Sequence, residues 1–413
     1  MTKRKTFYNR LAIGLAAVGP GLFLIGYNIG TGSVTTMARA GARYGMSLFW
    51  ALVLSCIFTY ILMVAYGQMT LVSGNTALNN FKNYFRIGKP LSIYIIIALI
   101  TGELLAIMGV MGIVVDLLQE GIQMASGHEV GGFSITLVLV VVLYAMLWFG
   151  HYKGFEKVLT VFVIGMALCF IIVFFMVKPD ITVIAKGMVP RIPKQTGAFQ
   201  LIAAMAGTTC SAAVFIVRST VVAEKGWTIN DLKTEKKDAF VSAGMMLLLS
   251  GVIMAVAAGT LFVMGLDLTN TVEMIALFEP LGGTSAAYIL ILGIAGAGLS
   301  TVFPIILIAP WLICDYAGIK RDIKTPLFRI LGGIGILFSF GLVFIDERPP
   351  AMMIFSQAFQ ALILPAVAIP IFILINNEKL MGKYKAGKWM NIGLMAVIIF
   401  SLITSYFAII DLL

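Results

Sequence analysis

The sequence predicts an all-α integral membrane protein with about eleven transmembrane helices, and three observations lead to this fold class. Of its 413 residues, 60% are hydrophobic and only 12% are charged, which is typical of a chain embedded in a bilayer. Apolar runs of about 18–30 residues recur along it, and each is long enough to cross the hydrocarbon layer as a helix. Small and polar stretches interrupt two of these runs at corresponding places, which indicates irregular backbone at membrane depth.

The predicted spans form a single transmembrane domain over 1–413. They are expected at 11–42, 46–70, 91–118, 132–150, 157–177, 197–222, 238–265, 284–314, 326–345, 350–376 and 389–411. The first run is too long for a cleavable signal peptide and has no clear cleavage site. The connections are short and polar, so no separate soluble domain is predicted.

The basic residues are distributed unevenly between the two sides of the predicted bundle. The N-terminal tail and the even-numbered connections carry 21 of the 29 Lys and Arg residues. Because basic residues concentrate in cytoplasmic loops, this predicts a multi-pass protein of a bacterial cytoplasmic membrane with its N-terminus inside and its C-terminus outside. The net charge of +10 is spread over these connections, which disfavours a nucleic-acid partner. Attraction to anionic lipid headgroups is an alternative reading of the same charges.

Patterns typical of enzymes and metal centres are missing from the sequence. The four cysteines, Cys56, Cys169, Cys210 and Cys314, lie in apolar segments without a CxxC pair, and both histidines fall in connections. No phosphate loop, nucleophile elbow or paired-carboxylate constellation occurs. The sequence therefore predicts neither an enzyme nor a bound cofactor, and no His-based metal site.

Two stretches predict broken helices. The first is "GYNIGTGSV" at Gly26–Val34, and the second is "GTTCSA" at Gly207–Ala212. Interrupted spans at corresponding places of two halves are typical of inverted-repeat transporters that bind their substrate at the midplane. This divides the chain into a first repeat at 11–177, a second at 197–376 and an additional helix at 389–411. Alternatively, the small residues only allow close helix packing.

Three motifs resemble the Nramp family of divalent-metal transporters. "GPGLFLIGYNIGTGS" at Gly19–Ser33 resembles the family's first span, and "SQAFQALILPAVAIPIFILINNEKLMGKYK" at Ser356–Lys385 resembles its tenth. "GAGLST" at Gly296–Thr301 is a looser match to the eighth span. The resemblance covers nearly the whole chain. It implies a LeuT-type fold within the APC superfamily, with two inverted five-helix repeats, broken first and sixth helices and an eleventh helix.

The same resemblance shows which of the family's metal ligands are absent. Where Nramp proteins have Asp-Pro-Gly-Asn, this sequence has Gly30–Ser33, and where they have Met-Pro-His it has Ser211–Ala213. The family's glutamate in the third span is retained as Glu103, but the following aspartate is replaced by Val110. A transition metal is therefore disfavoured, whereas a hydrated hard ion such as magnesium stays open.

The predicted substrate site lies at the ends of the half-helices. Helices expected to begin near Val34 and Ala212 would present unpaired N–H groups, and the half-helices before them would present carbonyls. The candidate substrate-binding residues are Asn28, Gly30, Thr31, Ser33, Thr208, Thr209, Ser211 and Gln357. A site with both dipole signs suits a small polar or zwitterionic organic solute. No metal-binding side chain is predicted.

Glu103 and Arg218 are the candidates for a coupling-ion or proton path. Glu103 is equally well explained as a protonated carboxyl bonded to a neighbouring helix. Arg218 alternatively pairs with Glu224 as a structural clamp. Sodium held by carbonyls at the breaks, protons and uncoupled transport all stay open.

The sequence as a whole predicts a secondary transporter that moves an organic solute across the bilayer by alternating access. The alternatives are a transporter for a hydrated divalent cation, a channel and a substrate sensor. Its oligomeric state does not follow from the sequence.

Overall fold

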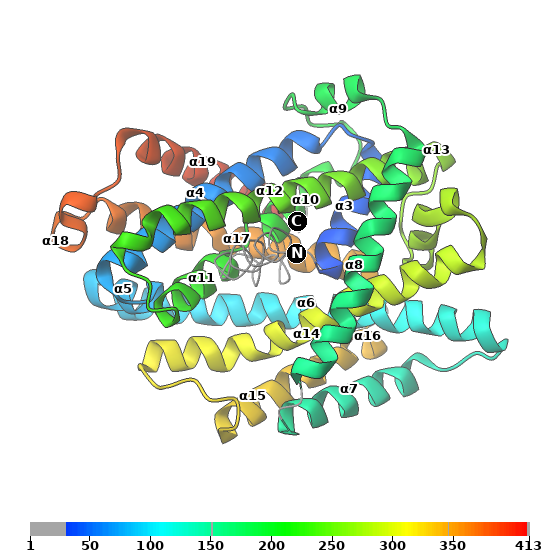
Figure 1. Cartoon of the computed structure of the whole chain (residues 1–413), viewed down its shortest axis with the longest axis horizontal. Helices are drawn as coiled ribbons and strands as arrows, with labels where there is room; N and C mark the ends of the chain where they lie inside the picture. Colours follow the sequence, from blue (N-terminus) through cyan, green and yellow to red (C-terminus); the bar gives the residue numbers. More distant parts are fainter. Residues whose placement is uncertain (1–29, 150–151, 346, 411–413) are drawn as a thin grey trace, which may run out of the picture.

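The computed structural model describes residues 30–149, 152–345 and 347–410. Long helices run side by side through the molecule, and short elements cover the two ends of the bundle (Figure 1). The described residues contain helices, turns and loops but no strand. The prediction of an all-α protein is confirmed.

The helices of the first half include four long, uninterrupted ones. Their bounds are α3 (Thr31–Tyr44), α4 (Phe49–Ser73), α5 (Ala77–Tyr84), α6 (Gly88–Ser126), α7 (Gly132–Phe149), α8 (Tyr152–Val177) and α9 (Ile181–Gly187). The short α5 and α9 lie outside the predicted spans.

The second half has more interruptions. Its elements are α10 (Ala198–Thr209), α11 (Ala212–Glu224), η1 (Ile229–Asp231), α12 (Leu232–Gly259), α13 (Leu261–Met264), η2 (Thr271–Leu281), α14 (Gly283–Ala317), α15 (Pro326–Leu337), η3 (Phe338–Phe340), α16 (Gly341–Phe344), α17 (Pro349–Ile375), α18 (Glu378–Met381), η4 (Gly382–Tyr384) and α19 (Lys388–Ile410).

The predicted spans agree with these helices. Among the described residues, nine helical segments are long and apolar enough to cross a membrane, and α8 together with α9 makes a tenth. The described part of the first predicted span is α3. Every other predicted span from 46–70 to 389–411 has a helical counterpart. The predicted bounds of the two repeats stay a prediction.

Local sequence explains several helix ends. Gly74, Gly127 and Gly318 follow α4, α6 and α14 with φ of 67°, 71° and 70°, the left-handed conformation that glycine adopts at little cost. Pro349 begins α17, where its missing N–H would have no partner within the helix. These residues place the polar connections at the ends of the bundle.

The sixth span is broken as predicted, over a shorter stretch. Helix α10 continues through Thr209, and α11 begins at Ala212 with Ser211 as its N-cap residue. Only Cys210 and Ser211 leave the helical conformation. The start predicted near Ala212 is confirmed.

The helix predicted near Val34 begins three residues earlier, at Thr31. Thr31 and Ser33 therefore belong to the first helical turn rather than to an unwound segment. Gly30 is the N-cap residue and is the first described residue of this stretch. The preceding part, with Asn28, lies outside the described residues.

The broken sixth span lies in the centre of the bundle. In the apolar window of Ala198–Glu224, 94% of the residues are buried, against 28% in the windows of α7 and of Pro326–Phe344. Central placement surrounds the interrupted backbone with protein, which replaces its missing helical hydrogen bonds. The peripheral helices expose apolar side chains suited to lipid.

Candidate functional site

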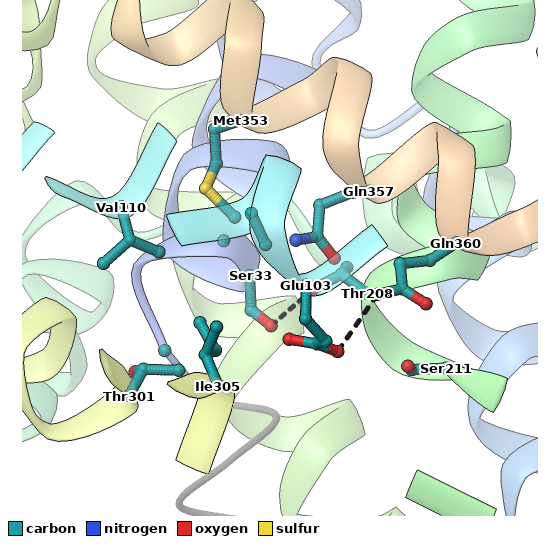
Figure 2. Close-up of a pocket in the computed structure, with 13 residues that line it drawn as sticks. Ser33, Glu103, Val110, Thr208, Ser211, Thr301, Ile305, Met353, Gln357 and Gln360 are labelled. Carbon is teal, nitrogen blue, oxygen red and sulfur yellow. Dashed lines mark hydrogen bonds between the residues drawn. The ribbon is translucent and has the colours of Figure 1, made fainter. Parts of the chain in front are cut away.

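A small cavity lies where the start of α3 and the broken sixth span meet α6, α14 and α17 (Figure 2). Its volume is about 40 Å³. Because one water position needs about 10–15 Å³, the cavity holds an ion or a few waters. The described lining residues are Gly30, Gly32, Ser33, Glu103, Ala106, Val110, Thr208, Ser211, Thr301, Ile305, Met353, Gln357 and Gln360.

Two hydroxyl groups join the broken helices at this cavity. The Ser33 Oγ atom of α3 lies 2.9 Å from Thr208 Oγ1 of α10, and either atom can be the donor. Ser211 lines the cavity at the start of α11. Neither Gly30 nor Ser211 caps its helix through a side-chain hydrogen bond. The N-terminal ends of α3 and α11 therefore bring positive helix dipole to the cavity.

Glu103 is the acidic residue of the cavity. It is the one charged side chain among the described lining residues, and it is only 4% exposed. Gln360 Nε2 donates a 3.0 Å hydrogen bond to Glu103 Oε1, so α6 and α17 hold the carboxyl group together (Figure 2). The geometry thus fits both interpretations of Glu103, as part of an ion or proton path and as a carboxyl group bonded to a neighbouring helix. It faces the cavity and is bonded to α17.

The glycines of the first break allow other helices to approach. A Cβ atom on Gly30 would lie 2.5 Å from Thr301 Oγ1 of α14. One on Gly32 would lie 2.6 Å from Met353 Cε and 2.9 Å from Gln357 Nε2 of α17. A side chain at either position would push these groups away or fill the cavity.

Most of the predicted site residues come together here. The cavity is lined by Gly30, Ser33, Glu103, Thr208, Ser211 and Gln357. Thr31 and Thr209 are not among the lining residues. Thr31 Oγ1 faces the Ile294 carbonyl oxygen at 3.5 Å, and Thr209 Oγ1 donates a 2.7 Å hydrogen bond to the Met205 carbonyl of its own helix. These two hydroxyl groups thus lie outside the lining of the cavity, and their role in substrate binding stays a prediction.

Arg218 also lies away from the cavity. Its Nε donates to Glu235 Oε1 at 2.9 Å, and its Nη2 lies 2.8 Å from Glu235 Oε1 and 2.9 Å from Asp238 Oδ2. All three side chains are at most 1% exposed. Glu224 pairs with Arg321 instead. Arg218 is therefore a clamp between α11 and α12, but its predicted partner Glu224 was wrong.

Several lining residues were missed at the sequence level. Thr301 and Ile305 come from α14, Ala106 from α6 and Met353 from α17. Thr301 lies in the "GAGLST" stretch, so its hydroxyl group was a visible signal. Met353 is one of 23 methionines, and composition does not indicate which of them reaches the cavity.

The donor set of the cavity is rich in oxygen. Around the Glu103 carboxylate it contains hydroxyl groups, the side-chain amides of Gln357 and Gln360, and the Met353 thioether. Over the described residues, no group of three or more His, Cys, Asp or Glu side chains can hold a metal ion. Hard cations prefer oxygen ligands and retain water, whereas softer metals favour imidazole or thiolate. The cavity therefore suits a hard ion better than a soft one.

Related proteins are named as divalent-metal transporters. The family model of natural resistance-associated macrophage protein-like (Nramp) proteins matches residues 21–411. The divalent metal cation transporter MntH of Staphylococcus saprophyticus is 24% identical, with 94% of this chain and 90% of the relative covered. MntH of Pectobacterium carotovorum is 23% identical, with 94% and 92% covered.

Solved structures share the fold at lower sequence identity. A mutant of the manganese transporter of Eremococcus coleocola matches with a TM-score of 0.74 and 14% identity, over 94% of this chain and 85% of the other. MhsT in complex with L-phenylalanine matches with a TM-score of 0.63 and 14% identity, over 95% and 98%. These likenesses confirm the LeuT-type architecture. With the family model matching almost its whole length, the chain belongs to the Nramp family, whose members are membrane transporters and not enzymes.

Proposed function

We propose that this protein is an alternating-access secondary transporter for a small, hard divalent cation, bound with part of its water shell in the cavity around Glu103. One observation carries the proposal: a single buried carboxylate faces an oxygen-lined cavity of about 40 Å³. The names of the relatives, divalent metal cation transporter and manganese transporter, support the same class of substrate.

The chemistry of the cavity limits which cation fits. Magnesium keeps several waters and needs only one or two carboxylates from a protein. Waters on the ion would be hydrogen-bonded by Ser33, Thr208 and Ser211, while Glu103 would compensate its charge. A buried ion without such compensation costs at least about 2.5–3.5 kcal/mol. Manganese, which also accepts oxygen ligands, is the second cation of this proposal.

A small polar or zwitterionic solute is the second candidate. The helix ends at Gly30 and Ser211 and the hydroxyl groups near them favour it, because together they hydrogen-bond both charged ends of a zwitterion. Sites for small organic ligands usually measure about 300–1,000 Å³. The cavity of about 40 Å³ is too small for an amino acid or a sugar in this conformation. This candidate therefore requires a conformation with a wider cavity.

Uptake into proteoliposomes tests the proposal. We expect saturable uptake of Mg²⁺ or Mn²⁺ by the purified full chain. Uptake rates measured with a sodium gradient alone and with a proton gradient alone then identify the driving ion. Saturation separates a transporter from a channel. A chain that transports an amino acid or sugar but neither cation would contradict the proposal.

Two neighbouring threonines provide a matched pair of variants. Thr208→Val removes the hydroxyl group that contacts Ser33, so we expect KM for the cation to rise about fivefold, equivalent to one hydrogen bond of about 1 kcal/mol. Thr209→Val removes a hydroxyl group that bonds its own helix, so KM stays unchanged. Equal effects of both substitutions on KM would remove Thr208 from the site.

Glu103→Gln tests the countercharge. It keeps the size and hydrogen-bonding capacity of the side chain but removes its charge, so we expect cation affinity to fall roughly a hundredfold, from the loss of about 2.5–3.5 kcal/mol of compensation. Cation binding is measured by calorimetry beside uptake, with thermal stability as the folding control. Unchanged affinity in a folded Glu103→Gln variant would exclude Glu103 as the countercharge.

A further inference from the structure

A second cavity, of about 420 Å³, lies beside the short helix α9. It is bounded by α9, by the loop at 188–197 and by Met46 and Ser47 of the turn that follows α3. Three basic residues, Lys186, Arg191 and Lys194, line it together with apolar side chains. None of the described lining residues is acidic. We call this cavity the α9 groove.

Within the described part of the chain, no carboxylate lies in ion-pair contact with the three basic side chains of the α9 groove. The nearby carboxylate of Asp180 is already engaged, because Thr182 donates to it through its backbone N and its Oγ1, both at 2.8 Å. These bonds, with a smaller contribution from Lys186, hold the pKa of Asp180 below its ordinary value. A lowered pKa keeps Asp180 ionised, so its charge offsets part of the charge of Lys186. The charges of Arg191 and Lys194 remain to attract an anion into the groove.

The surroundings of the groove are apolar. Helix α9 is bent by 113° from α8 and so runs across the end of the bundle instead of continuing the span (Figure 1). Ile181 is 79% exposed, Val189 is 52% exposed and Val183 is 48% exposed. An exposed apolar rim beside cations is typical of a segment that lies at the membrane interface.

The backbone around the groove is held firmly. A Cβ atom on Gly187 would lie 2.2 Å from the Met46 carbonyl oxygen, so α9 packs directly on the turn after α3. Trp50 Nε1 donates a 2.9 Å hydrogen bond to the carbonyl oxygen of Arg191. The groove is thus part of the packed structure, with its basic side chains on a fixed backbone.

We propose that the α9 groove binds the phosphate group of an anionic phospholipid such as phosphatidylglycerol. Lys186, Arg191 and Lys194 compensate the phosphate charge, and the exposed Ile181 and Val189 contact its acyl chains. The apolar rim favours a lipid over free phosphate, because a soluble anion would leave these side chains in water.

Bound lipid would also stabilise the loop that links the groove to the end of α3, the helix whose start lines the cavity around Glu103. Near the end of the loop at 188–197, Thr196 Oγ1 accepts a 3.2 Å hydrogen bond from Arg43 Nη2, and the Thr196 carbonyl accepts a 2.7 Å bond from the Tyr44 hydroxyl. Arg43 Nη1 lies 3.4 Å from Asp267 Oδ2 as well. These contacts tie the loop to the end of α3. A lipid bound to the basic side chains of this loop therefore adds to the contacts that hold it against the end of α3.

Native mass spectrometry of the full chain in detergent tests the assignment. Phosphatidylglycerol and phosphatidylcholine with identical acyl chains are added in equal amounts, and we expect phosphatidylglycerol to be retained preferentially. The neutral variant K186Q/R191Q/K194Q loses about a hundredfold in affinity, at about fivefold for each cation near a lipid phosphate. The charge-conserving variant K186R/R191K/K194R retains the lipid. Lys178→Gln, which removes a charge outside the groove, leaves binding unchanged.

Three results would overturn the proposal. If the neutral variant retains as much phosphatidylglycerol as the wild type, the groove is excluded as the lipid site. Equal retention of phosphatidylcholine by the wild type would exclude charge recognition. Glycerol phosphate or inorganic phosphate that competes as strongly as the lipid would show a soluble-anion site. To test whether the lipid stabilises this loop, amide hydrogen exchange in 188–197 is measured. It slows with phosphatidylglycerol in the wild type and not in the neutral variant.

Discussion

Single atoms decide the shape of the cavity around Glu103. Gly207 of α10 faces the backbone of α17, and a Cβ atom there would lie 1.8 Å from the Gln357 carbonyl oxygen. Backbone cannot rotate away as a side chain does, so the contact requires glycine. It also brings Thr208 into register with Ser33 across the cavity. Within "GTTCSA", Gly207 thus allows the close packing that the sequence offered as the alternative reading, while Thr208 and Ser211 line the cavity.

Gly207→Ala tests this contact. We expect the variant to fold but to unfold at a lower temperature. Forced separation of the two helices should lower the free energy of unfolding by about 1–3 kcal/mol. Gly244→Ala in α12 is the control, because no atom lies within 4 Å of its added Cβ and alanine favours a helix by up to about 1 kcal/mol. Thermal unfolding in detergent measures both. A Gly207→Ala protein as stable as Gly244→Ala would show that α10 and α17 are not in this contact.

At the scale of helices, a buried cluster of charged side chains holds α11, the second half of the sixth span, in place. Arg218 joins α11 to the first turns of α12 through Glu235 and Asp238, with all three side chains withdrawn from solvent. One guanidinium group faces two carboxylates, so each charge depends on the others for compensation. Because Ser211 at the start of the same helix lines the cavity, the cluster also positions α11 at the site.

Arg218→Met removes the compensating charge while keeping most of the volume. We expect a loss of about 3–5 kcal/mol of stability, because Glu235 and Asp238 lose the guanidinium group that compensates them in the buried cluster. Arg321→Gln breaks a more exposed pair with Glu224 and should cost at most about 1 kcal/mol. Thermal midpoints in one detergent compare the two variants. Similar small losses would mean that the cluster is open to water.

At the scale of the whole molecule, charge distribution predicts its orientation in the membrane. With the N-terminus inside, the loop after α6 is outside and the loop after α14 is inside. His128 and Lys320 lie in these loops and are both exposed. The described ends of the bundle thus offer one reporter position on each side.

Labelling of introduced cysteines tests the orientation. We expect His128→Cys to react with a membrane-impermeant maleimide in intact cells, and Lys320→Cys to react only after permeabilisation, because the basic loops stay in the cytoplasm. The unmodified chain is the background control, because three of its cysteines lie in apolar helices and the fourth, Cys210, is buried at the break of the sixth span. The reverse labelling pattern would invert the topology.

The sequence by itself determined the membrane class, the positions of the spans and the broken sixth helix. Each follows from a local requirement: apolar length to cross the bilayer, glycine where the backbone turns and small polar residues where a span is interrupted. The start of α3 was predicted three residues late, because its first turn is stabilised by packing against α14 and α17 and not by its own propensity.

Only the tertiary structure decided which polar side chains meet. Thr208 and Thr209 are adjacent and chemically identical, yet one lines the cavity and the other bonds its own helix. Successive helical residues point about 100° apart, and the face that packs inward depends on distant helices. The same reason explains why Arg218 pairs with Glu235 and Asp238 instead of Glu224. Local sequence specifies helices and their ends, whereas contacts between helices specify the site.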